Sequence, residues 1–417
     1  MAYTVTTRTT YGQRLGKSLK GIVTGFIMFL IGTVVLFWNE GNFVKTKKSL
    51  QEAESVLVRV RDASQIDPAL DGKLIHASAF ADTQETLMDG LFGVSEVAIA
   101  LSRSVEYYQH KENSRSQTRD LVGGGQETVT TYTYERAWSA TPINSGAFND
   151  PSYKNSNFTL TTVEQKTERA KDVSFGAYKL PAFIIASITG SIPAAVNLST
   201  DEIAQWQQQV ARNNPNAQQM VHVSGNTVYF GASPTQPAIG DLRVTLTKIL
   251  PADVSVIAKV FGNTFEHYIA KNGKTVSSVS MGTVSPEAMF AGEHSANKML
   301  AWILRLVGMF LVVGGLKAMF GILPTLFKVL PFLGNIVGAG VGFVCSIVGG
   351  AWSLVIIGIS WLFYRPLIGI PLLLLAASGI WLLKKRAKES KTSPPTAPEE
   401  PATSPPLDFT VNAPVQK

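Results

Sequence analysis

The residue types best suited to catalysis or metal binding in this sequence are five histidines and one cysteine. Metal sites usually draw their ligands from positions a few residues apart, whereas each histidine here stands alone, so a metal site would need assembly from distant segments. The sequence contains no G-x-S-x-G elbow, phosphate-binding P-loop or H-E-x-x-H motif. We therefore predict a protein that is not an enzyme and holds no metal or cofactor. The histidines are His76, His110, His222, His267 and His294.

The single cysteine, Cys345, lies in an apolar stretch and excludes an intrachain disulfide. The neighbouring glycine-rich residues 338–342 imitate a nucleotide-binding loop, but no strand leads into them. Small residues recur at every fourth position here, a pattern that lets a second helix approach closely. We interpret this stripe as a helix-packing surface whose partner belongs either to the same chain or to another. It comprises Gly334, Gly338, Gly342, Ser346 and Gly350.

Four apolar stretches predict four membrane-spanning helices. The first, residues 21–38, carries no charge and would measure about 27 Å as a helix, close to the hydrocarbon thickness of a bilayer. It ends in Phe37-Trp38, an aromatic pair suited to the membrane interface, so we predict an uncleaved signal anchor. Ser285 as an N-cap and Pro286 at the first helical position are expected to open the helix that leads into the second span.

Charged residues within predicted spans would normally indicate an ion or proton pathway. Arg305 lies inside the second span and Lys317 near its other end, but no aspartate or glutamate lies in any of the four spans to pair with them. We expect both side chains to extend to the membrane interface. Because a proton or ion relay usually requires a carboxylate, the sequence disfavours a secondary transporter.

The net charge of +7 comes from segments that flank the apolar stretches. Residues 1–20 carry +4 and residues 299–417 carry +6, which leaves −3 for residues 21–298. The basic excess therefore does not lie on the folded region, and nucleic-acid binding loses its main support. Because lysine and arginine accumulate on the cytosolic side of spans, we expect both termini in the cytosol and the large loop outside it. Lysines within residues 45–48 count against this orientation.

The loop between the first two spans is predicted to be β-rich with minor helix. Alternating residues at 131–138 are typical of a half-buried strand, which we pair with residues 97–108 across a polar, glycine-rich segment. Asn272-Gly273 predicts a two-residue hairpin turn. Other predicted strands are 55–60, 73–79, 221–229 with a turn at 224–226, 241–249, 254–260, 264–270 and 275–281, and the predicted helix is 200–212 with Thr200 as its N-cap.

Four short stretches occur in an order that indicates a family. They are Phe37-Trp38-Asn39-Glu40-Gly41 with Val44-Lys45-Thr46 and Ser49-Leu50, then Tyr132 to Trp138 with Ile143-Asn144-Ser145 and Phe148, then Val228-Tyr229-Phe230 with Pro237 and Gly240-Asp241-Leu242-Arg243-Val244, and finally Trp361-Leu362-Phe363-Tyr364-Arg365-Pro366-Leu367. With these stretches in this order, and with one span before and three after a large loop, the sequence resembles the transmembrane protein 43 family, also called LUMA. The motif residues are Asn39, Glu40, Gly41, Gly240, Asp241, Arg243, Trp361, Tyr364, Arg365 and Pro366.

The resemblance implies a four-span protein with a large lumenal domain. In eukaryotes the family occurs in the endoplasmic reticulum and inner nuclear membrane, where members self-associate and contact lamina-linked proteins such as emerin. Bacterial relatives exist, and no catalytic residues are established for the family. The proline-rich tail departs from the short basic end of animal members. We interpret Asn39 as the cap of the first span, Gly41 as a residue with positive φ, and Glu40 as the partner of a nearby lysine.

Two functions remain open at this point. The first is a membrane organising or scaffold protein that self-associates and binds other membrane or envelope proteins. The second is a lipid- or small-molecule-handling protein with a pocket between the loop domain and the bilayer. A channel formed by self-association is a third possibility. The predicted organisation is a cytosolic N-terminus at 1–20, spans at 21–38, 299–320, 336–364 and 367–383, an extracytosolic β-rich domain at 39–298, and a disordered cytosolic tail at 384–417.

Overall fold

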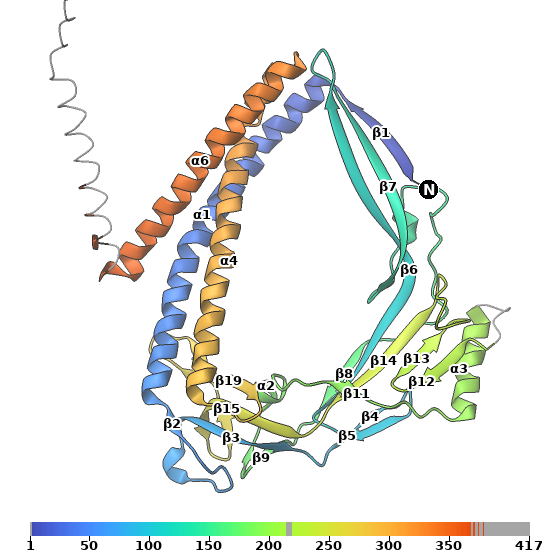
Figure 1. Cartoon of the computed structure of the whole chain (residues 1–417), viewed down its shortest axis with the longest axis vertical. Coiled ribbons are helices and arrows are strands. Elements are labelled where there is room, and N and C mark those ends of the chain that lie inside the picture. The colour runs from blue at the N-terminus through green and yellow to red at the C-terminus, as the bar shows by residue number, and fades with distance from the viewer. Residues whose placement is uncertain (1, 214–218, 368–369, 372–373, 375–377, 379–417) are drawn as a thin grey trace, which may run out of the picture. The chain divides into compact units, whose positions relative to one another are not determined.

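The computed structural model describes residues 2–213, 219–367, 370–371, 374 and 378. Its residue contacts divide the chain into two units, Met1–Ser360 and Trp361–Lys417. The first unit combines long helices with two large β-sheets (Figure 1). Three helical stretches among the described residues are long and apolar enough to cross a membrane. They are α1 (Tyr11–Val56), α4 (Pro286–Phe320) continued by the short α5 (Ile322–Phe327), and α6 (Pro331–Tyr364).

These helices match three of the predicted spans, whereas the predicted fourth, residues 367–383, lies largely outside the described residues. The predicted start of the second helix is confirmed, because Ser285 is the N-cap and Pro286 is the first residue of α4. The predicted end of the first helix is wrong. The helix continues past Trp38 to Val56, because its second half packs against α4 and the β-rich domain.

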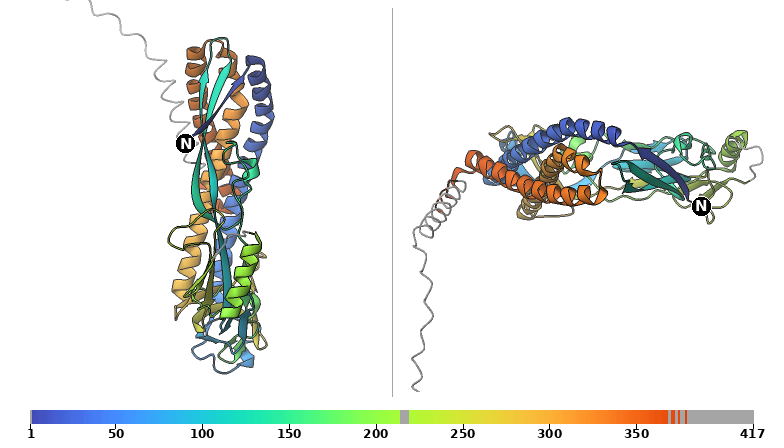
Figure 2. Two further views of the ribbon diagram at one scale, coloured as in Figure 1. Left: turned by 90° about the vertical axis from the view of Figure 1, so that its right-hand side faces the viewer. Right: turned by 90° about the horizontal axis from the view of Figure 1, so that it is seen from above.

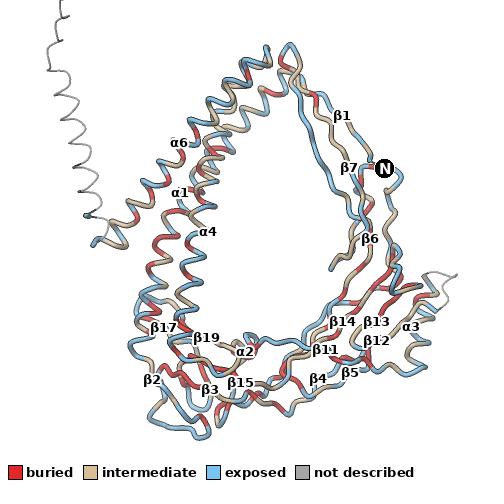
Figure 3. The backbone as a smooth tube through the Cα atoms, viewed as in Figure 1, coloured by how far each residue is buried: buried red, intermediate tan, exposed pale blue. Residues whose placement is uncertain are grey.

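The helices α1 and α4 lie side by side (Figures 1 and 2). Glycines bring their backbones together at two levels. A Cβ on Gly25 would lie 2.5 Å from the carbonyl oxygen of Gly315, and one on Gly32 would lie 2.9 Å from that of Gly308. A larger side chain at these positions would force the helices apart. Much of the outward surface of the helices is exposed, as expected for faces that meet lipid (Figure 3).

The larger sheet contains eight strands, and its central path runs β1-β7-β6-β14-β13-β12. One hydrophobic core, which includes Val105, Phe230 and Leu246, packs against this sheet. In order along the path, these strands are β1 (Tyr3–Thr9), β7 (Gln126–Ser139), β6 (Ala100–Asp120), β14 (Leu242–Ile249), β13 (Thr227–Phe230) and β12 (Val221–Ser224), with β8 (Lys166–Arg169) beside β6 and β11 (Ile192–Pro193) beside β14.

The second sheet contains seven strands, and its path runs β10-β9-β3-β15-β16. A separate core with Ile75, Phe175 and Val256 packs against it. Its strands are β10 (Tyr178–Lys179), β9 (Ser174–Phe175), β3 (Leu74–Asp82), β15 (Ala252–Phe261), β16 (Thr264–Glu266), β19 (Ser278–Met281) and β2 (Val58–Arg59). Smaller elements are the hairpins β4 (Thr86–Asp89) with β5 (Val94–Val97) and β17 (Tyr268–Ile269) with β18 (Thr275–Val276), and the helices α2 (Ala182–Ile185) and α3 (Thr200–Asn213).

Several predicted strands are confirmed, notably β3, β14 and β15, and the Asn272-Gly273 turn does connect β17 to β18. Residues 131–138 do form a strand that pairs with β6, but the predicted partner segment 97–108 is wrong, because β7 pairs with β6 from Tyr107↔Ser139 to Asp120↔Gln126 and residues 100–107 pair with β14 on the other edge. Most of the polar segment expected to be a loop is therefore strand. The predicted N-cap Thr200 is wrong. Ser199 occupies that role, since its hydroxyl accepts the N–H of Glu202.

The N-terminal segment has a structural role that the sequence did not predict. Residues 3–9 form β1, which pairs antiparallel with β7 from Tyr3↔Tyr132 to Thr9↔Gln126 and so belongs to the larger sheet. The strand β6 has 21 residues and α1 has 46, which correspond to about 70 Å and about 69 Å. The β6–β7 hairpin is therefore long enough to reach the N-terminal end of α1, and Figure 1 shows it doing so.

This pairing predicts a labelling pattern for a chain whose α1 crosses a bilayer. In a Cys345→Ser background, single cysteines replacing Thr7 in β1 and the 85 % exposed Val122 at the hairpin tip should react with a membrane-impermeant maleimide from the same side of sealed vesicles. Ser64→Cys, which follows the other end of α1, should react from the opposite side. Labelling of the Thr7 and Val122 positions from opposite sides would show that β1 does not pair with β7 in the membrane.

Candidate functional site

The motif residues of the first span form a buried polar contact between α1 and α4. Asn39 and Glu40 are 1 % and 0 % exposed, and Gly41 is also buried. The carboxylate of Glu40 accepts two hydrogen bonds from Arg305, with Oε1 2.5 Å from Nε and Oε2 2.9 Å from Nη2. The guanidinium also lies over the ring of Trp302, 4.8 Å from its centroid. Paired, planar contacts of this kind are among the stronger ionic interactions in proteins.

Two asparagines extend this contact in both directions. Asn39 of α1 donates from Nδ2 to the carbonyl of Ala301 on α4 at 3.0 Å, and Asn297 of α4 donates to the carbonyl of Phe43 on α1 at 3.1 Å. The donors and acceptors are spaced by about one helical turn on each helix, so the two bonds are reciprocal. We name Asn39, Glu40, Asn297 and Arg305 the α1–α4 clasp.

The structure of this region corrects four interpretations from the sequence. Asn39 does not cap the first span, and Gly41 does not have a positive φ, because both lie within the continuous helix α1. The carboxylate of Glu40 pairs with Arg305 instead of with a lysine, and Arg305 does not extend alone to the interface. The sequence argument missed this pair because Glu40 lies just beyond the apolar stretch, and only the packing of α1 on α4 brings it level with Arg305.

A second charged contact joins the hairpin tip to the helix ends. The carboxylate of Asp120, at the end of β6, lies 2.9 Å from Nη2 of Arg14 and 2.9 Å from Nζ of Lys328. Arg14 is only 7 % exposed and also donates from Nη1 to the carbonyls of Gly124 and Gly125. Arg14 is one of the basic residues within 1–20 from which we placed the N-terminus in the cytosol. The sequence did not predict that its guanidinium also pairs with Asp120 inside the protein.

The third motif, Gly240-Asp241-Leu242-Arg243, forms the corner that leads into β14. Gly240 has a φ of +97°, and a Cβ there would collide with the ring of Phe158. Asp241 is 3 % exposed, and its Oδ2 accepts hydrogen bonds from the Tyr229 hydroxyl and from the Ala238 N–H. Leu242 is fully buried and Arg243 only partly, as expected for a strand with one face against the core.

The side chain of Arg243 packs against aromatic and acidic neighbours on the sheet. Its guanidinium lies 4.4 Å from the centroid of the Trp138 ring, and Nε donates to Glu106 at 2.5 Å. The rings of Trp138 and Tyr229 meet edge to face with centroids 6.3 Å apart. These contacts tie β6, β7, β13 and β14 together, so this motif fixes the base of the long hairpin.

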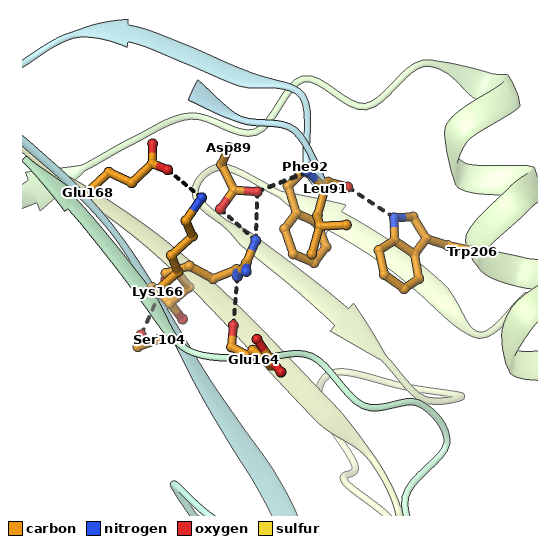
Figure 4. Close-up of polar contacts among 10 residues, drawn as sticks. Asp89, Leu91, Phe92, Ser104, Glu164, Lys166, Glu168 and Trp206 are labelled. Atoms are coloured by element: carbon orange, nitrogen blue, oxygen red, sulfur yellow. Dashed lines mark hydrogen bonds and ion pairs between the residues drawn. The ribbon is translucent and has the colours of Figure 1, made fainter. Parts of the chain in front are cut away.

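A further buried ion pair, between Arg103 of β6 and Asp89 of β4, was not predicted (Figure 4). Nη1 of Arg103 lies 2.8 Å and 2.7 Å from the two carboxylate oxygens, and its Nε donates to the carbonyl of Glu164. Asp89 Oδ1 also accepts the N–H groups of Leu91 and Phe92. Both charges therefore have structural partners, which indicates a role in fixing the β4–β5 hairpin.

The small-residue stripe of α6 does not pack along one neighbouring helix of the described structure. A Cβ on Gly334 would collide with Lys328, and one on Gly338 would lie 3.5 Å from Pro324, but at Gly342 and Gly350 it would meet nothing within 4 Å. Ser346 is exposed, and its hydroxyl donates to the carbonyl of Gly342. Each step of four residues turns about 40° around a helix, so no single neighbouring helix of the described structure follows the whole stripe.

The close contact of α6 with α4 is made by a different glycine. A Cβ on Gly349 would lie 2.7 Å from Cγ2 of Val313. Buried Ser353 and Ile356 continue this face, and Ile356 packs with Leu36 and Val312. This face could have been predicted from the sequence, since residues 349, 353, 356 and 360 follow the helical period. The more regular repeat of small residues from 334 to 350 led us to choose a different face of the helix.

The last motif lies at the end of α6, in the second unit of the chain. Trp361 and Tyr364 belong to the final turn of the helix, and the N–H of Arg365 donates to the carbonyl of Trp361 at 2.8 Å. The guanidinium of Arg365 lies 5.8 Å from the centroid of the Trp361 ring. Pro366 follows directly. The helix α6 therefore ends at Tyr364, directly before Arg365 and Pro366.

The histidines occupy separate positions in the structure. His76 contacts the carbonyl of Val284, His110 the hydroxyl of Ser156, His267 the hydroxyl of Ser277, and His294 the carboxylate of Glu54. His222 lies on β12. Within the described part of the chain, no group of three or more histidine, cysteine, aspartate or glutamate side chains is arranged to hold a metal ion.

Together, the long apolar helices and the β-rich insertion between α1 and α4 define a multi-span membrane protein with a large folded domain between its first and second spans. Residues 107–366 match the family model described as Transmembrane protein 43, and this chain belongs to that family.

Known relatives agree with this assignment. The chain is 29 % identical to Transmembrane protein 43 of Homo sapiens over 391 residues, which cover 91 % of this chain and 93 % of that protein, and the protein of Rattus norvegicus gives the same values. It is 26 % identical to the Transmembrane protein 43 homolog of Drosophila melanogaster over 369 residues, which cover 86 % and 93 % of the two chains. No solved structure matches this chain.

The clasp predicts a large effect of removing one of its charges. Glu40→Met leaves the guanidinium of Arg305 without its carboxylate, so we expect a loss of about 3–5 kcal/mol of stability, whereas the double variant with Arg305→Met should recover most of it. The measurement is thermal unfolding of the purified protein in detergent. The exposed pair Arg59–Glu287 is the control, and Glu287→Met should cost less than about 1 kcal/mol. Equal losses at both sites would contradict the role of the clasp.

The Gly240-Asp241 corner predicts a pH dependence of stability. Burial raises the pKa of the Asp241 carboxyl, while the hydrogen bonds from Ala238 and Tyr229 oppose this shift. A raised pKa means that the folded state binds the proton more tightly than the unfolded chain, so this contribution is present at low pH and is lost as pH rises through the folded pKa. Asp241→Asn removes the titration and should gain stability relative to the native chain between about pH 4 and about pH 7. A constant difference in melting temperature over that range would contradict this.

Proposed function

We propose that this chain is a multi-pass membrane organising protein that acts through self-association and the binding of other membrane or envelope proteins. The proposal assigns no enzymatic activity to this chain. Its proposed location is an integral membrane: the endoplasmic reticulum or inner nuclear membrane in a eukaryotic cell, or the cytoplasmic membrane with a periplasmic domain in a bacterium. The predicted orientation, with the bulk of the domain on the extracytosolic side, is part of this proposal.

The open edge of β6 carries the proposal. The strand β14 pairs with one edge of β6 up to Tyr107. Beyond Tyr107 only the opposite edge of β6 is paired, and its partner there is β7. At the unpaired edge the Asn157 side chain forms hydrogen bonds with the backbone N–H and carbonyl of His110. No strand among the described residues pairs with positions 112–120 on this edge. Residues 113–119 are all exposed. A long, open strand edge is a template for a strand from another chain.

The exposed side of α6 supports the same proposal within the membrane. Gly342, Ser346 and Gly350 present backbone and a hydroxyl without bulky side chains, and nothing lies within 4 Å of a Cβ built on either glycine. Helices in lipid associate by close backbone approach, because lipid offers no hydrophobic drive toward burial. A helix from a second copy or from a partner would fit this face.

A second candidate function is favoured by one cavity. A space of about 550 Å³ lies where α1 enters the β-rich domain and α4 leaves it. Charged groups surround it, including Glu54, Arg59, Glu287 and His294. Such a mixed lining suits a small polar molecule or a lipid headgroup, which is the alternative function considered from the sequence.

The open edge predicts how self-association is blocked. In the β6 edge the N–H groups of Tyr108 and His110 point away from β7, and by alternation so does that of Ser114. Ser114→Pro should therefore prevent a strand from adding to this edge while leaving the β6–β7 pairing intact. We expect the native chain in lipid vesicles to crosslink as oligomers and the proline variant to shift toward monomers.

Two controls make this experiment decisive. Ser114→Ala keeps the backbone N–H and should crosslink like the native chain, and all variants should elute as folded particles in detergent. Oligomers of equal abundance in the proline and native proteins would remove the β6 edge from the proposal. A native chain that is monomeric in vesicles would contradict self-association and favour the second candidate function.

A further inference from the structure

An apolar cavity lies among the helices α4, α5 and α6. Its volume is about 420 Å³, and its lining includes Leu316, Phe320, Leu323, Gly340, Val344 and Cys345. This volume falls in the range of about 300–1,000 Å³ that is usual for ligand sites. All of these residues belong to the helices that are long and apolar enough to cross a membrane. The cavity is distinct from the polar one beside Glu54 and from the open edge of β6.

The backbone of the helices creates this cavity. Close contacts hold α6 at two levels: Gly349 packs on Val313 of α4, and Gly338 lies next to Pro324 of α5. Between these levels, a Cβ built on Gly340 would meet nothing within 4 Å. Gly321 separates α4 from α5, and both helices contribute residues to the lining. The cavity extends over residues 340–348 of α6, about 12 Å along the helix axis.

The chemistry of the lining selects an apolar occupant. Among the described residues that line the cavity, the Cys345 thiol is the one side chain that is not a hydrocarbon or an aromatic ring. Such a surface gives no strong hydrogen bond to a polar ligand, and burying a polar group there would cost free energy. A hydrocarbon chain incurs no such cost. Since the surroundings of these helices are lipid, the acyl chains of membrane lipids are the most abundant hydrocarbon within reach.

One cation stands beside the cavity. Lys317 follows the lining residue Leu316 in the last turn of α4 and is exposed. Lys317 forms no ion pair with any residue that the structure describes, whereas Lys328, on the turn after α5, is paired with Asp120. A lysine near the interface attracts the phosphate of a lipid headgroup.

We propose that this cavity binds one phospholipid of the surrounding membrane, with an acyl chain between α4, α5 and α6 and the anionic headgroup on Lys317. The lipid fills the space between two glycine contacts and so holds α6 at a fixed distance from α4. The site lies within the spans and is independent of the strand edge that carries the proposed self-association.

The test uses the full-length protein in phosphatidylcholine vesicles that contain phosphatidylglycerol with a photoactivatable diazirine on one acyl chain. After illumination, mass spectrometry should find adducts on peptides covering residues 316–323 and 340–348. Gly340→Phe fills the cavity and should reduce these adducts to background. Gly342→Phe, which adds the same ring outside the lining, is the matched control and should keep them.

The headgroup contact is tested separately. Lys317→Gln should lower the yield with the phosphatidylglycerol probe about fivefold, and it should leave the yield with a phosphatidylcholine probe that carries the same diazirine chain almost unchanged. Both glycine variants and the lysine variant must elute as the native protein does in detergent. An equal loss of both probes would overturn the role of Lys317.

Two outcomes would overturn the proposal as a whole. Equal labelling of the Gly340→Phe and native proteins would show that the probe reports only lipid at the outer helix faces. Photo-leucine incorporated into the native chain offers the second test, because it captures whatever contacts Leu316 and Leu323. Crosslinks from these residues to residues 367–383 or to a second copy, without a lipid adduct, would assign the cavity to a protein segment.

Discussion

The pairing of α1 with α4 is the contact on which the rest of the structure depends. The chain enters the β-rich domain from α1 and leaves it through α4, so both ends of that domain are fixed to one helix pair. In the apolar part the pair is held by glycines that let the backbones touch, because helices in lipid gain little from burying apolar surface. Beyond Trp38 the contact becomes polar, and the ion pair of Glu40 with Arg305 replaces close packing of glycines.

The long hairpin adds a constraint of a different kind. Because β6 is about as long as α1, strands that start in the domain reach the far end of that helix, where Asp120 forms ion pairs with Arg14 and Lys328. The hairpin also takes up β1, the segment that precedes α1. Residues 113–119 near its tip are exposed and all polar, and an open strand edge of this kind is not tolerated against hydrocarbon. Protein or water must therefore surround this part of the hairpin, and an open edge on β6 is consistent with a protein partner.

The sequence was sufficient to predict those elements whose structure is determined by neighbouring residues. The apolar stretches predicted the long helices, Ser285-Pro286 predicted the start of α4, and Asn272-Gly273 predicted a hairpin turn. Prediction was wrong where distant packing extends an element. The helix α1 continues past Asn39 because α4 satisfies the polar groups there, and β6 continues past Tyr108 because β7 pairs with it over residues whose polarity suggested a loop.

The sequence by itself determined the apolar helices, the β-rich insertion between the first two of them and the motifs of the family, because hydrophobic length, alternation and short motifs are properties of neighbouring residues. Only the tertiary structure decided which charges meet. Glu40 pairs with Arg305, which lies 265 positions away in the sequence, and Asp120 at the hairpin tip pairs with Arg14 near the start of α1. An ion pair depends on the distance in space and not on the separation along the chain.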